Sequence, residues 1–300
     1  MKKTASALLV ALLTTLTAPA ANIAWVSFHA GDNSPTSAAA NLGYTQAPDV
    51  GYTSLLAANG HTVTRFVTKN DPTAADATYL NSFDLIIVGR SVDSANYQQA
   101  NETLFWNSTI IKPVILMGGY VLRNSRLGYT SGATIPDVSS AQIALSVVSP
   151  SHPIFAGIPL DGANLMVNPY AQLITTAPTS VAQRGISVNT DPLVGGGSIL
   201  ARLGPTGDAA VNGMIIGEWA WGSTLPNGNK LGNERLVFLS GSREQATGGS
   251  SQQAGMYDLI GDGPQMFLNA VNYMSVIPEP STLGLLAVGG LALLLRRARA

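Results

Sequence analysis

Hydrophobic and polar positions along residues 22–120 alternate in a way that predicts strands separated by helices. Apolar or β-branched runs predict strands over Ile23–Phe28, Thr62–Val67, Phe83–Val88 and Pro113–Met117. The continuous apolar character of the last two indicates burial on both faces. Helical spacing predicts helices over Asp49–Asn59, with Asp49 as the cap, and over Ser94–Asn107. Strands joined through helices pair in parallel, so this half predicts a parallel sheet flanked by helices.

The pattern loosens after Gly128, where Gly, Pro, Ser and Thr become frequent. The better strand candidates in this part are Ser198–Leu203, Gly213–Gly217 and Arg235–Ser240. A closing helix starts at Asp262-Gly263-Pro264 and repeats apolar residues at helical spacing as far as Met274. We therefore predict one α/β domain over residues 22–275, with a mostly parallel sheet flanked by helices and an irregular β-rich second half.

Residues 1–20 have the pattern of a secretory signal peptide. Lys2 and Lys3 precede an apolar stretch over Ala5–Leu16, and Ala18-Pro19-Ala20 provides small residues for cleavage after Ala20. A buried N-terminal helix is the alternative, but it leaves the lysine pair and the cleavage pattern unexplained. The chain is therefore expected to be exported by the secretion machinery.

The C-terminus shows three features in order: Pro278-Glu279-Pro280, then the apolar segment Leu283–Leu295, then Arg296, Arg297 and Arg299. At about 1.5 Å per residue the apolar segment reaches only about 20 Å, less than the hydrocarbon thickness of a bilayer. The arginines are expected to hold the extreme C-terminus in the cytoplasm. The prolines keep the tripeptide out of a helix and leave it extended.

Residues 276–300 resemble the PEP-CTERM sorting signal of exported bacterial proteins. The resemblance implies a Gram-negative source, recognition by an exosortase-type membrane protease and cleavage near Pro278-Glu279-Pro280. It also implies a transient inner-membrane intermediate, with residues 283–295 as a short transmembrane segment, before delivery to the outer surface or an extracellular matrix. An uncleaved tail anchor is the alternative.

Charge and cysteine content narrow the function classes. The chain has 16 Lys and Arg and 17 Asp and Glu, of which five basic residues and Glu279 lie in the two end segments, so residues 22–275 hold 11 basic and 16 acidic residues. This acidic excess excludes a basic groove for nucleic acid. The chain has no Cys, which excludes disulfides, thiolate metal sites and a Cys nucleophile.

A further resemblance covers most of residues 22–275. The segments that carry it are Ile23–Phe28, Leu85–Val88 entering Gly89-Arg90-Ser91, the strand ending in Met117-Gly118-Gly119-Tyr120, the His-Pro-Ile-x-x-Gly pattern within Ser151–Ile158, and Gly232–Gly241 before the closing helix. Their order resembles the flavodoxin-like, class I glutamine amidotransferase-like fold, nearest its trehalose-utilisation-type branch. In true amidotransferases the turn after the fourth strand carries a catalytic Cys. Here no Cys is present, so amidotransferase activity is not expected.

Candidate binding residues follow the predicted parallel strands, because ligands of such sheets bind outside the carboxyl ends of the strands. His29 and Asp32 follow the first strand, and Arg90, Ser91 and Asp93 follow the third. Together they can hold an anionic or polyhydroxyl ligand, or one metal ion. Loop capping and solvated side chains are the alternative interpretation.

Later residues add further candidates. Gly118 and Gly119 allow a positive φ, so their amides can bind an oxyanion. His152, before Pro153, can face the same crevice. The segment Glu218-Trp219-Ala220-Trp221 resembles a carbohydrate-stacking patch, since tryptophan faces suit sugar rings. The alternatives are a tight turn at the glycines, a conformational His-Pro corner and buried packing of the two tryptophans.

Nothing in the sequence indicates a cofactor or a dedicated metal site: Gly195-Gly196-Gly197 lacks the Lys and Ser/Thr of a phosphate loop, and only three His are present. Two functions of different class remain. The first is an exported envelope or matrix protein that is non-catalytic or interacts with carbohydrate, with extracellular polysaccharide as a partner. The second is a secreted polysaccharide-acting hydrolase or lyase that uses His29, Asp32, His152 or Glu218 in the crevice at the carboxyl edge.

Overall fold

A computed structural model describes residues 20–136, 138, 143–171, 185–205, 209–244 and 249–276. The predicted signal peptide, apart from Ala20, lies outside the described residues. So do Pro278, Glu279 and Pro280, the segment 283–295, and Arg296, Arg297 and Arg299. Within the described residues, no helix is both long and apolar enough to cross a membrane.

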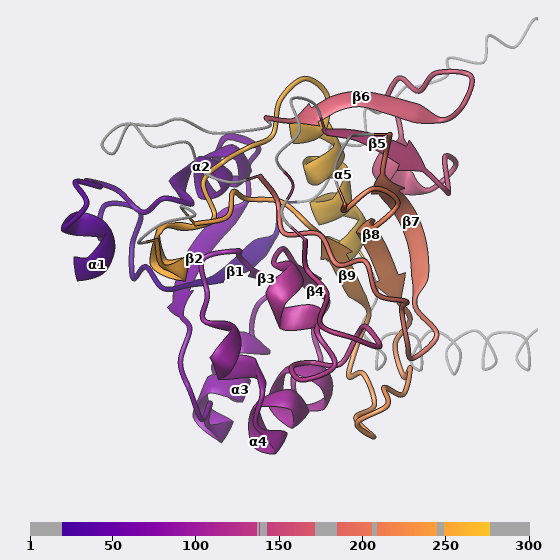
Figure 1. Ribbon diagram of the computed structural model, residues 1–300. Helices are drawn as coiled ribbons and strands as arrows, with labels where there is room; N and C mark the ends of the chain where they lie inside the picture. The colour runs from indigo at the N-terminus through magenta and orange to yellow at the C-terminus, as the bar shows by residue number, and fades with distance from the viewer. Residues whose placement is uncertain are drawn as a thin grey trace, which may run out of the picture.

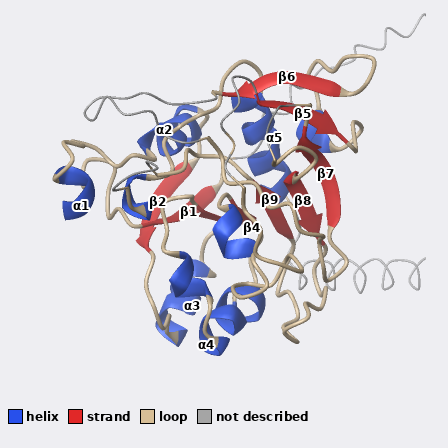
Figure 2. Ribbon diagram, in the orientation of Figure 1, coloured by secondary structure: helices blue, strands red, loops and turns tan. Residues whose placement is uncertain are grey.

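One mixed sheet forms the centre of the fold, with the strand order β2-β1-β3-β4-β9-β8-β7-β5-β6 (Figures 1 and 2). Its strands are β1 (Asn22–Ser27), β2 (Thr62–Val67), β3 (Leu85–Val88), β4 (Val114–Leu116), β5 (Ile143–Val147), β6 (Leu165–Tyr170), β7 (Ser198–Leu203), β8 (Met214–Trp219) and β9 (Arg235–Phe238). The strands β2, β1, β3, β4 and β9 run parallel to one another, and the pairs from β9 outward to β6 are antiparallel.

Helices cover both faces of the parallel part of the sheet. Figure 1 shows α2 (Val50–Ala58) and α5 (Gly263–Ser275) on one side, and α3 (Ala74–Leu80) and α4 (Ala100–Leu104) on the other. The smaller helices are α1 (Ser37–Ala40), η1 (Ser94–Tyr97), η2 (Phe105–Thr109), η3 (Gly119–Leu122), η4 (Pro153–Phe155) and η5 (Ser251–Gln253). The rings of Tyr52 in α2 and Phe267 in α5 meet with their centroids 5.5 Å apart, so these two helices share one apolar layer.

The α/β architecture is confirmed, but the prediction of a mostly parallel sheet is wrong. Among the described strands, four neighbouring pairs are parallel and four are antiparallel. The strands β5 and β6 were not predicted, because Ser146 interrupts the apolar pattern in the first and Asn168 and Pro169 interrupt it in the second. They pair as a hairpin, which needs no crossover helix between them.

The predicted helix over Ser94–Asn107 is also corrected. The segment forms a 3₁₀ turn, the short helix α4 and a π-helical turn in succession. The carboxylate of Glu102, itself buried, accepts the backbone N–H groups of Gln98 and Gln99 at 3.0 and 2.8 Å. This capping box starts a new helix at Ala100, because it satisfies backbone donors that a continuous helix would use internally.

Candidate functional site

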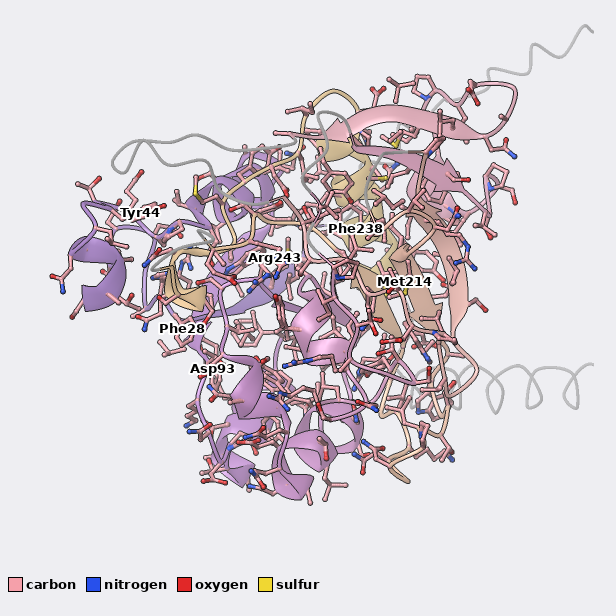
Figure 3. The ribbon with its side chains drawn as sticks, viewed as in Figure 1. Phe28, Tyr44, Asp93, Met214, Phe238 and Arg243 are labelled. Carbon is pink, nitrogen blue, oxygen red and sulfur yellow. The ribbon has the colours of Figure 1, made fainter. Side chains whose placement is uncertain are left out.

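The loops after the parallel strands meet at one edge of the sheet, which we call the carboxyl edge. The loops after β1 and β3 are joined there by the backbone N–H of Phe28, which donates to the carbonyl of Ser91 at 2.8 Å. Figure 3 shows Phe28 and Asp93, from these two loops, on the same side of the molecule. The loops after β4 and β9 are joined by the N–H of Ser240, which donates to the carbonyl of Met117 at 3.2 Å. The predicted convergence of these loops is therefore present.

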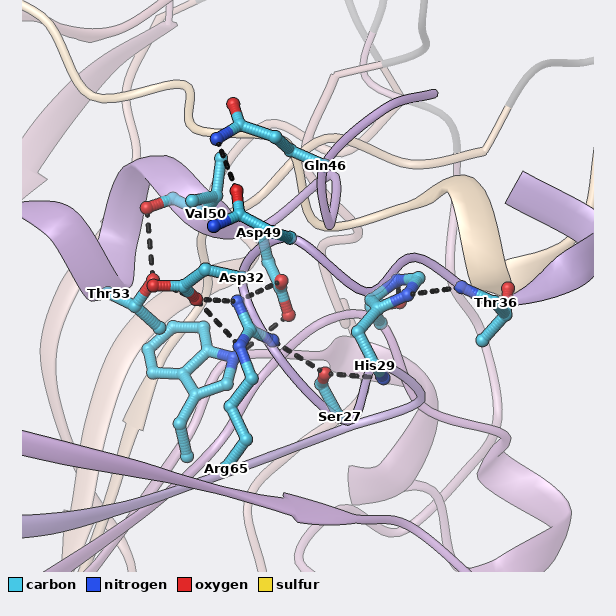
Figure 4. Close-up of polar contacts among 12 residues, drawn as sticks. Ser27, His29, Asp32, Thr36, Gln46, Asp49, Val50, Thr53 and Arg65 are labelled. Atoms are coloured by element: carbon cyan, nitrogen blue, oxygen red, sulfur yellow. Dashed lines mark hydrogen bonds and ion pairs between the residues drawn. The ribbon is translucent and has the colours of Figure 1, made fainter. Parts of the chain in front are cut away.

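His29 and Ser91 lie in contact at this edge, and both side chains are buried. The Nε2 of His29 is 3.1 Å from the Oγ of Ser91. The backbone N–H of Thr36 donates to His29 Nδ1 at 3.1 Å, so Nδ1 must be the unprotonated nitrogen (Figure 4). In the neutral ring Nε2 is then the hydrogen-bond donor to Ser91. The hydroxyl of Ser91 in turn donates a hydrogen bond to the carbonyl of Ser251 at 3.2 Å.

This direction of donation runs opposite to the one that a nucleophilic serine needs. A catalytic histidine accepts the serine proton, whereas His29 donates to Ser91. Burial lowers the pKa of His29, although the Asp49 carboxylate opposes this effect. The lowered pKa favours the neutral ring. The pair therefore holds two loops together.

Asp32 and Asp49 share one cation. The Arg65 guanidinium lies 2.7 Å from the Oδ1 of Asp32 and 2.9 Å from the Oδ1 of Asp49 (Figure 4). The second oxygen of Asp49 accepts the indole N–H of Trp25 at 2.8 Å. Asp49 thus stands at the start of α2 without the side-chain cap bond that the sequence predicted. Its buried carboxylate pairs with the Arg65 guanidinium instead, because an opposite charge stabilises a buried charge far more than a hydrogen bond to the helix N-terminus does.

Three guanidinium groups surround the ring of Tyr120, in the 3₁₀ turn η3 that follows β4. The guanidinium carbons of Arg90, Arg123 and Arg243 lie 5.0, 5.3 and 5.2 Å from the ring centroid. Arg243 also donates to the phenolic oxygen. Tyr120, Arg123 and Arg243 were not identified from the sequence, because more than 100 residues separate the two arginines and no local pattern links them.

A pocket of about 180 Å³ opens beside this cluster. Its lining residues are Arg90, Val92, Asp93, Ser94, Tyr120, Glu244, Gly249, Ser250 and Ser251. We call this pocket, together with the bordering Arg123 and Arg243, the arginine pocket. Arg90 is buried and pairs with the Glu244 carboxylate at 2.7 Å. Burial lowers the pKa of Arg90, and Glu244 counteracts that effect.

Two other candidates at this edge have structural contacts. The Asp93 side chain accepts the N–H of Ala95 at 2.9 Å and so caps η1. Gly118 has a φ of −106°, not a positive value. The N–H of Gly119 donates to Ser187 Oγ at 3.0 Å, so this amide is not available to an oxyanion. A Cβ on Gly119 would lie 2.5 Å from the carbonyl oxygen of Ser187, and this close approach is why a glycine stands there.

His152 and Glu218 form a separate pair, away from the carboxyl edge. His152 Nε2 lies 3.4 Å from Glu218 Oε2, and the hydroxyl of Tyr273 donates to the same oxygen at 3.3 Å. Glu218 pairs in register with Leu236, near the start of β9, whereas the arginine pocket lies beyond the ends of β3, β4 and β9. The expectation that His152 faces the crevice at the carboxyl edge is therefore wrong, and Glu218 lies outside that crevice with it. The His152 contact lowers the pKa of Glu218.

Trp219 packs internally. Its indole N–H donates to the carbonyl of Val194 at 2.7 Å, and its ring meets Tyr129 edge to face with centroids 4.9 Å apart. Because the side chain is buried, it offers no face to a sugar ring. Its neighbour Trp221 is half-exposed. In the part of the chain that the structure describes, no three His, Asp or Glu side chains gather closely enough to hold a metal ion.

A buried polar cluster that the sequence did not predict lies beneath the loop after β9. Asp258 accepts hydrogen bonds from the hydroxyl groups of Tyr52 and Ser240 and from the N–H of Gly241. Asp258 is only 2% exposed to solvent, and this burial raises the pKa of its carboxyl group to about 6.

Comparisons with known proteins bear on the two parts of the chain differently. Residues 276–299 match the PEP-CTERM protein-sorting motif. No curated protein sequence matches the chain significantly. A similar solved structure is the cytoplasmic protein STM3548 from Salmonella typhimurium, at 10% identity and a TM-score of 0.46, over 84% of this chain and 98% of that one. These comparisons give no support to the amidotransferase-like interpretation of the body.

The chain therefore ends in a PEP-CTERM motif. The motif implies an exported protein that passes through the membrane and is recognised there by an exosortase.

Proposed function

We propose that this chain is a non-catalytic protein of the envelope or extracellular matrix, and that its body binds acidic polysaccharide through the arginine pocket. The observation that carries the proposal is the concentration of charge around Tyr120. Three of the 11 basic residues in 22–275 gather there, with their guanidinium carbons 5.0 to 5.3 Å from the centroid of the Tyr120 ring. In a body with an acidic excess, this corner is where an anion is attracted.

The chemistry of the arginine pocket suits a carboxylate on a sugar ring. Guanidinium groups match carboxylates in a planar, two-point geometry that lysine cannot offer. The hydroxyl groups of Ser94, Ser250 and Ser251 line the same pocket and suit ring hydroxyls. About 180 Å³ is small for a drug-sized ligand, which indicates a single sugar unit of a longer chain.

The proposal of binding without catalysis follows from how the acid and base side chains at the carboxyl edge are used. His29 donates to Ser91, Asp32 is paired with Arg65, and Asp93 caps η1. A general base must instead be within hydrogen-bond reach of a substrate proton. Each of these groups holds the loops in place, so the edge is rigid enough to present the arginines.

The order of the parallel strands supports a flavodoxin-like scaffold for this part of the body. The order β2-β1-β3-β4-β9 follows the 2-1-3-4-5 arrangement of doubly wound sheets. In that arrangement ligands bind at the carboxyl ends of the strands, where the arginine pocket lies. With no Cys in the chain, the scaffold lacks the thiol nucleophile of an amidotransferase.

The test measures binding of the full chain to polygalacturonate and to a neutral glucan at two salt concentrations. Arg123→Gln is the informative variant, because Arg123 is partly exposed and lies at the border of the pocket. We expect at least a tenfold loss of polygalacturonate affinity, equivalent to about 1.4 kcal/mol. Arg202→Gln on β7 is the matched control and is expected to bind normally. Equal affinity for the neutral glucan, or no effect of Arg123→Gln, would contradict the proposal.

A hydrolase or lyase is the competing function, and the contact between His152 and Glu218 is the observation that favours it. The carboxylate lines a pocket of about 240 Å³ together with Glu234 and Tyr273. The same glycan panel is therefore assayed for new reducing ends or unsaturated products. Turnover that Glu218→Gln abolishes would establish the enzyme and reject the non-catalytic proposal.

A further inference from the structure

Both ends of the described chain leave the body at the edge where the parallel strands begin, which we call the amino edge. At the N-terminal end, β1 begins at Asn22, two residues after Ala20. At the C-terminal end, α5 runs antiparallel to β9: the ring of Phe267 packs on Phe238 at the end of β9, with centroids 5.3 Å apart. Tyr273, near the end of α5, reaches Glu218 beside the start of β9.

Exposed apolar side chains lie at the same edge. Trp221 is 49% exposed and follows Trp219, which pairs in register with the first residue of β9. Ile111 is also 49% exposed, precedes β4, and is joined to the start of β9 because Asn233 donates to its carbonyl oxygen at 2.8 Å. Val276, at the end of α5, is 55% exposed.

The sorting motif limits how far this edge can lie from the membrane. The match to the motif begins at Val276, directly after α5 ends at Ser275. The apolar segment starts at Leu283, seven residues further on. Seven fully extended residues span at most about 25 Å. A body tethered this closely must present the edge that carries α5's C-terminal end to the lipid surface.

We propose that the amino edge rests on the outer face of the inner membrane while the tail is inserted, with Trp221 and Ile111 at the boundary between lipid headgroups and acyl chains. Tryptophan suits that position because its ring is apolar and its N–H finds polar partners. The arginine pocket, at the opposite edge of the sheet, then points away from the membrane. This proposal does not depend on what the pocket binds.

A lipid surface fits this edge better than a protein partner does. Stable protein interfaces bury on the order of 1,000 Å² or more with a contiguous apolar centre. Here individual apolar side chains stand among polar neighbours such as the partly exposed Glu234. A few inserted side chains are enough to hold this edge on the membrane when the tail already anchors the body there. The tether raises the effective concentration of these side chains at the lipid surface.

The composition of the chain offers two clean probes. Of its four tryptophans, Trp25, Trp106 and Trp219 are buried, so Trp221 is the one that contacts surroundings. The full chain is reconstituted in vesicles that contain lipids brominated near the headgroup end of the acyl chain. We expect these lipids to quench Trp221 emission, and we expect Trp221→Phe to lose that quenching.

The absence of Cys allows a unique spin label at any position, including in the Trp221→Phe background. Ile111→Cys reports the amino edge, and Val67→Cys is the matched control, since Val67 ends β2 at the carboxyl edge and is 45% exposed. We expect the label at 111 to become less accessible to a water-soluble relaxation agent in vesicles, and the label at 67 to stay accessible.

Equal accessibility of both labels in vesicles, or no lipid quenching of Trp221, would overturn the proposal. Shielding of the label at 111 that requires a co-reconstituted exosortase would also overturn it, because the covering partner would then be protein.

Discussion

Asp258 illustrates how burial sets the behaviour of a single residue. Its carboxylate is held by Tyr52, Ser240 and Gly241, and its Oδ2 has no hydrogen-bond partner among the described residues. Burial nevertheless dominates and raises the pKa from 3.8 to about 6. The folded protein therefore binds a proton between pH 4 and pH 6 that the unfolded chain releases, so protonation stabilises the fold.

The first prediction concerns this titration. Because the folded pKa is raised, the free energy of unfolding should fall as pH rises from about 4 through 6, by about 3 kcal/mol for a shift of about two pKa units. Asp258→Asn should remove this contribution. Urea unfolding of both forms between pH 4 and pH 8 gives the comparison, and a constant difference between the two curves would contradict the prediction.

At the scale of elements, Arg235 ties the start of β9 to the π-helical turn η2. The buried guanidinium donates to the carbonyls of Trp106, Asn107 and Ile110 at 3.1, 3.1 and 2.8 Å. It also donates to the carbonyl of Lys112 at 3.1 Å. Helix ends leave carbonyl groups without partners, and this side chain satisfies several of them at once.

The second prediction follows from those bonds. Arg235→Met keeps much of the side-chain volume but leaves buried carbonyls unpaired, so we expect the free energy of unfolding to fall by about 3 kcal/mol or more. Arg202→Met is the matched control, because Arg202 makes a single exposed carbonyl contact at 2.9 Å. Its loss should cost less than about 1 kcal/mol. Equal losses in the two variants, measured by urea unfolding, would show that the carbonyl bonds contribute little.

At the scale of the whole molecule, the body and the sorting motif meet without a long linker. The motif begins at Val276, and α5 is anchored in the core through Met266, Phe267, Val271 and Met274. The Pro-Glu-Pro segment must therefore reach the protease while the folded body stands directly beside it.

The third prediction concerns the tail. Replacing Arg296, Arg297 and Arg299 with Ser should leave export intact but impair retention and sorting, because each charge costs about 3 kcal/mol to move to the middle of the bilayer. Replacing Pro278-Glu279-Pro280 should leave the protein uncleaved in the inner membrane. Ala298→Ser is the control that alters the tail without changing its charge. Mass spectrometry of the mature protein decides the outcome: if residues 283–295 remain attached, a plain tail anchor replaces the sorting interpretation.

The sequence by itself determined the features that depend on local pattern. The β2 and β7 strands match their predicted bounds, because alternation and β-branching are properties of neighbouring residues. The sorting motif is likewise linear, and it was identified without structure. The contact between His29 and Ser91 was foreseeable, because the ends of parallel strands must meet at one edge.

Tertiary structure decided which partner each polar group takes. The sequence placed His29 near Ser91. Only the hydrogen bond from the backbone N–H of Thr36 to His29 Nδ1 showed that His29 donates to Ser91. The sequence predicted Asp49 as a helix cap, but its carboxylate forms an ion pair with Arg65 of β2 instead. Arg90, Tyr120 and Arg243 meet because β3, β4 and β9 are neighbours in the sheet, and β9 enters between β4 and β8 more than 100 residues after β4. Contacts between distant residues depend on strand order and register, which local spacing does not encode.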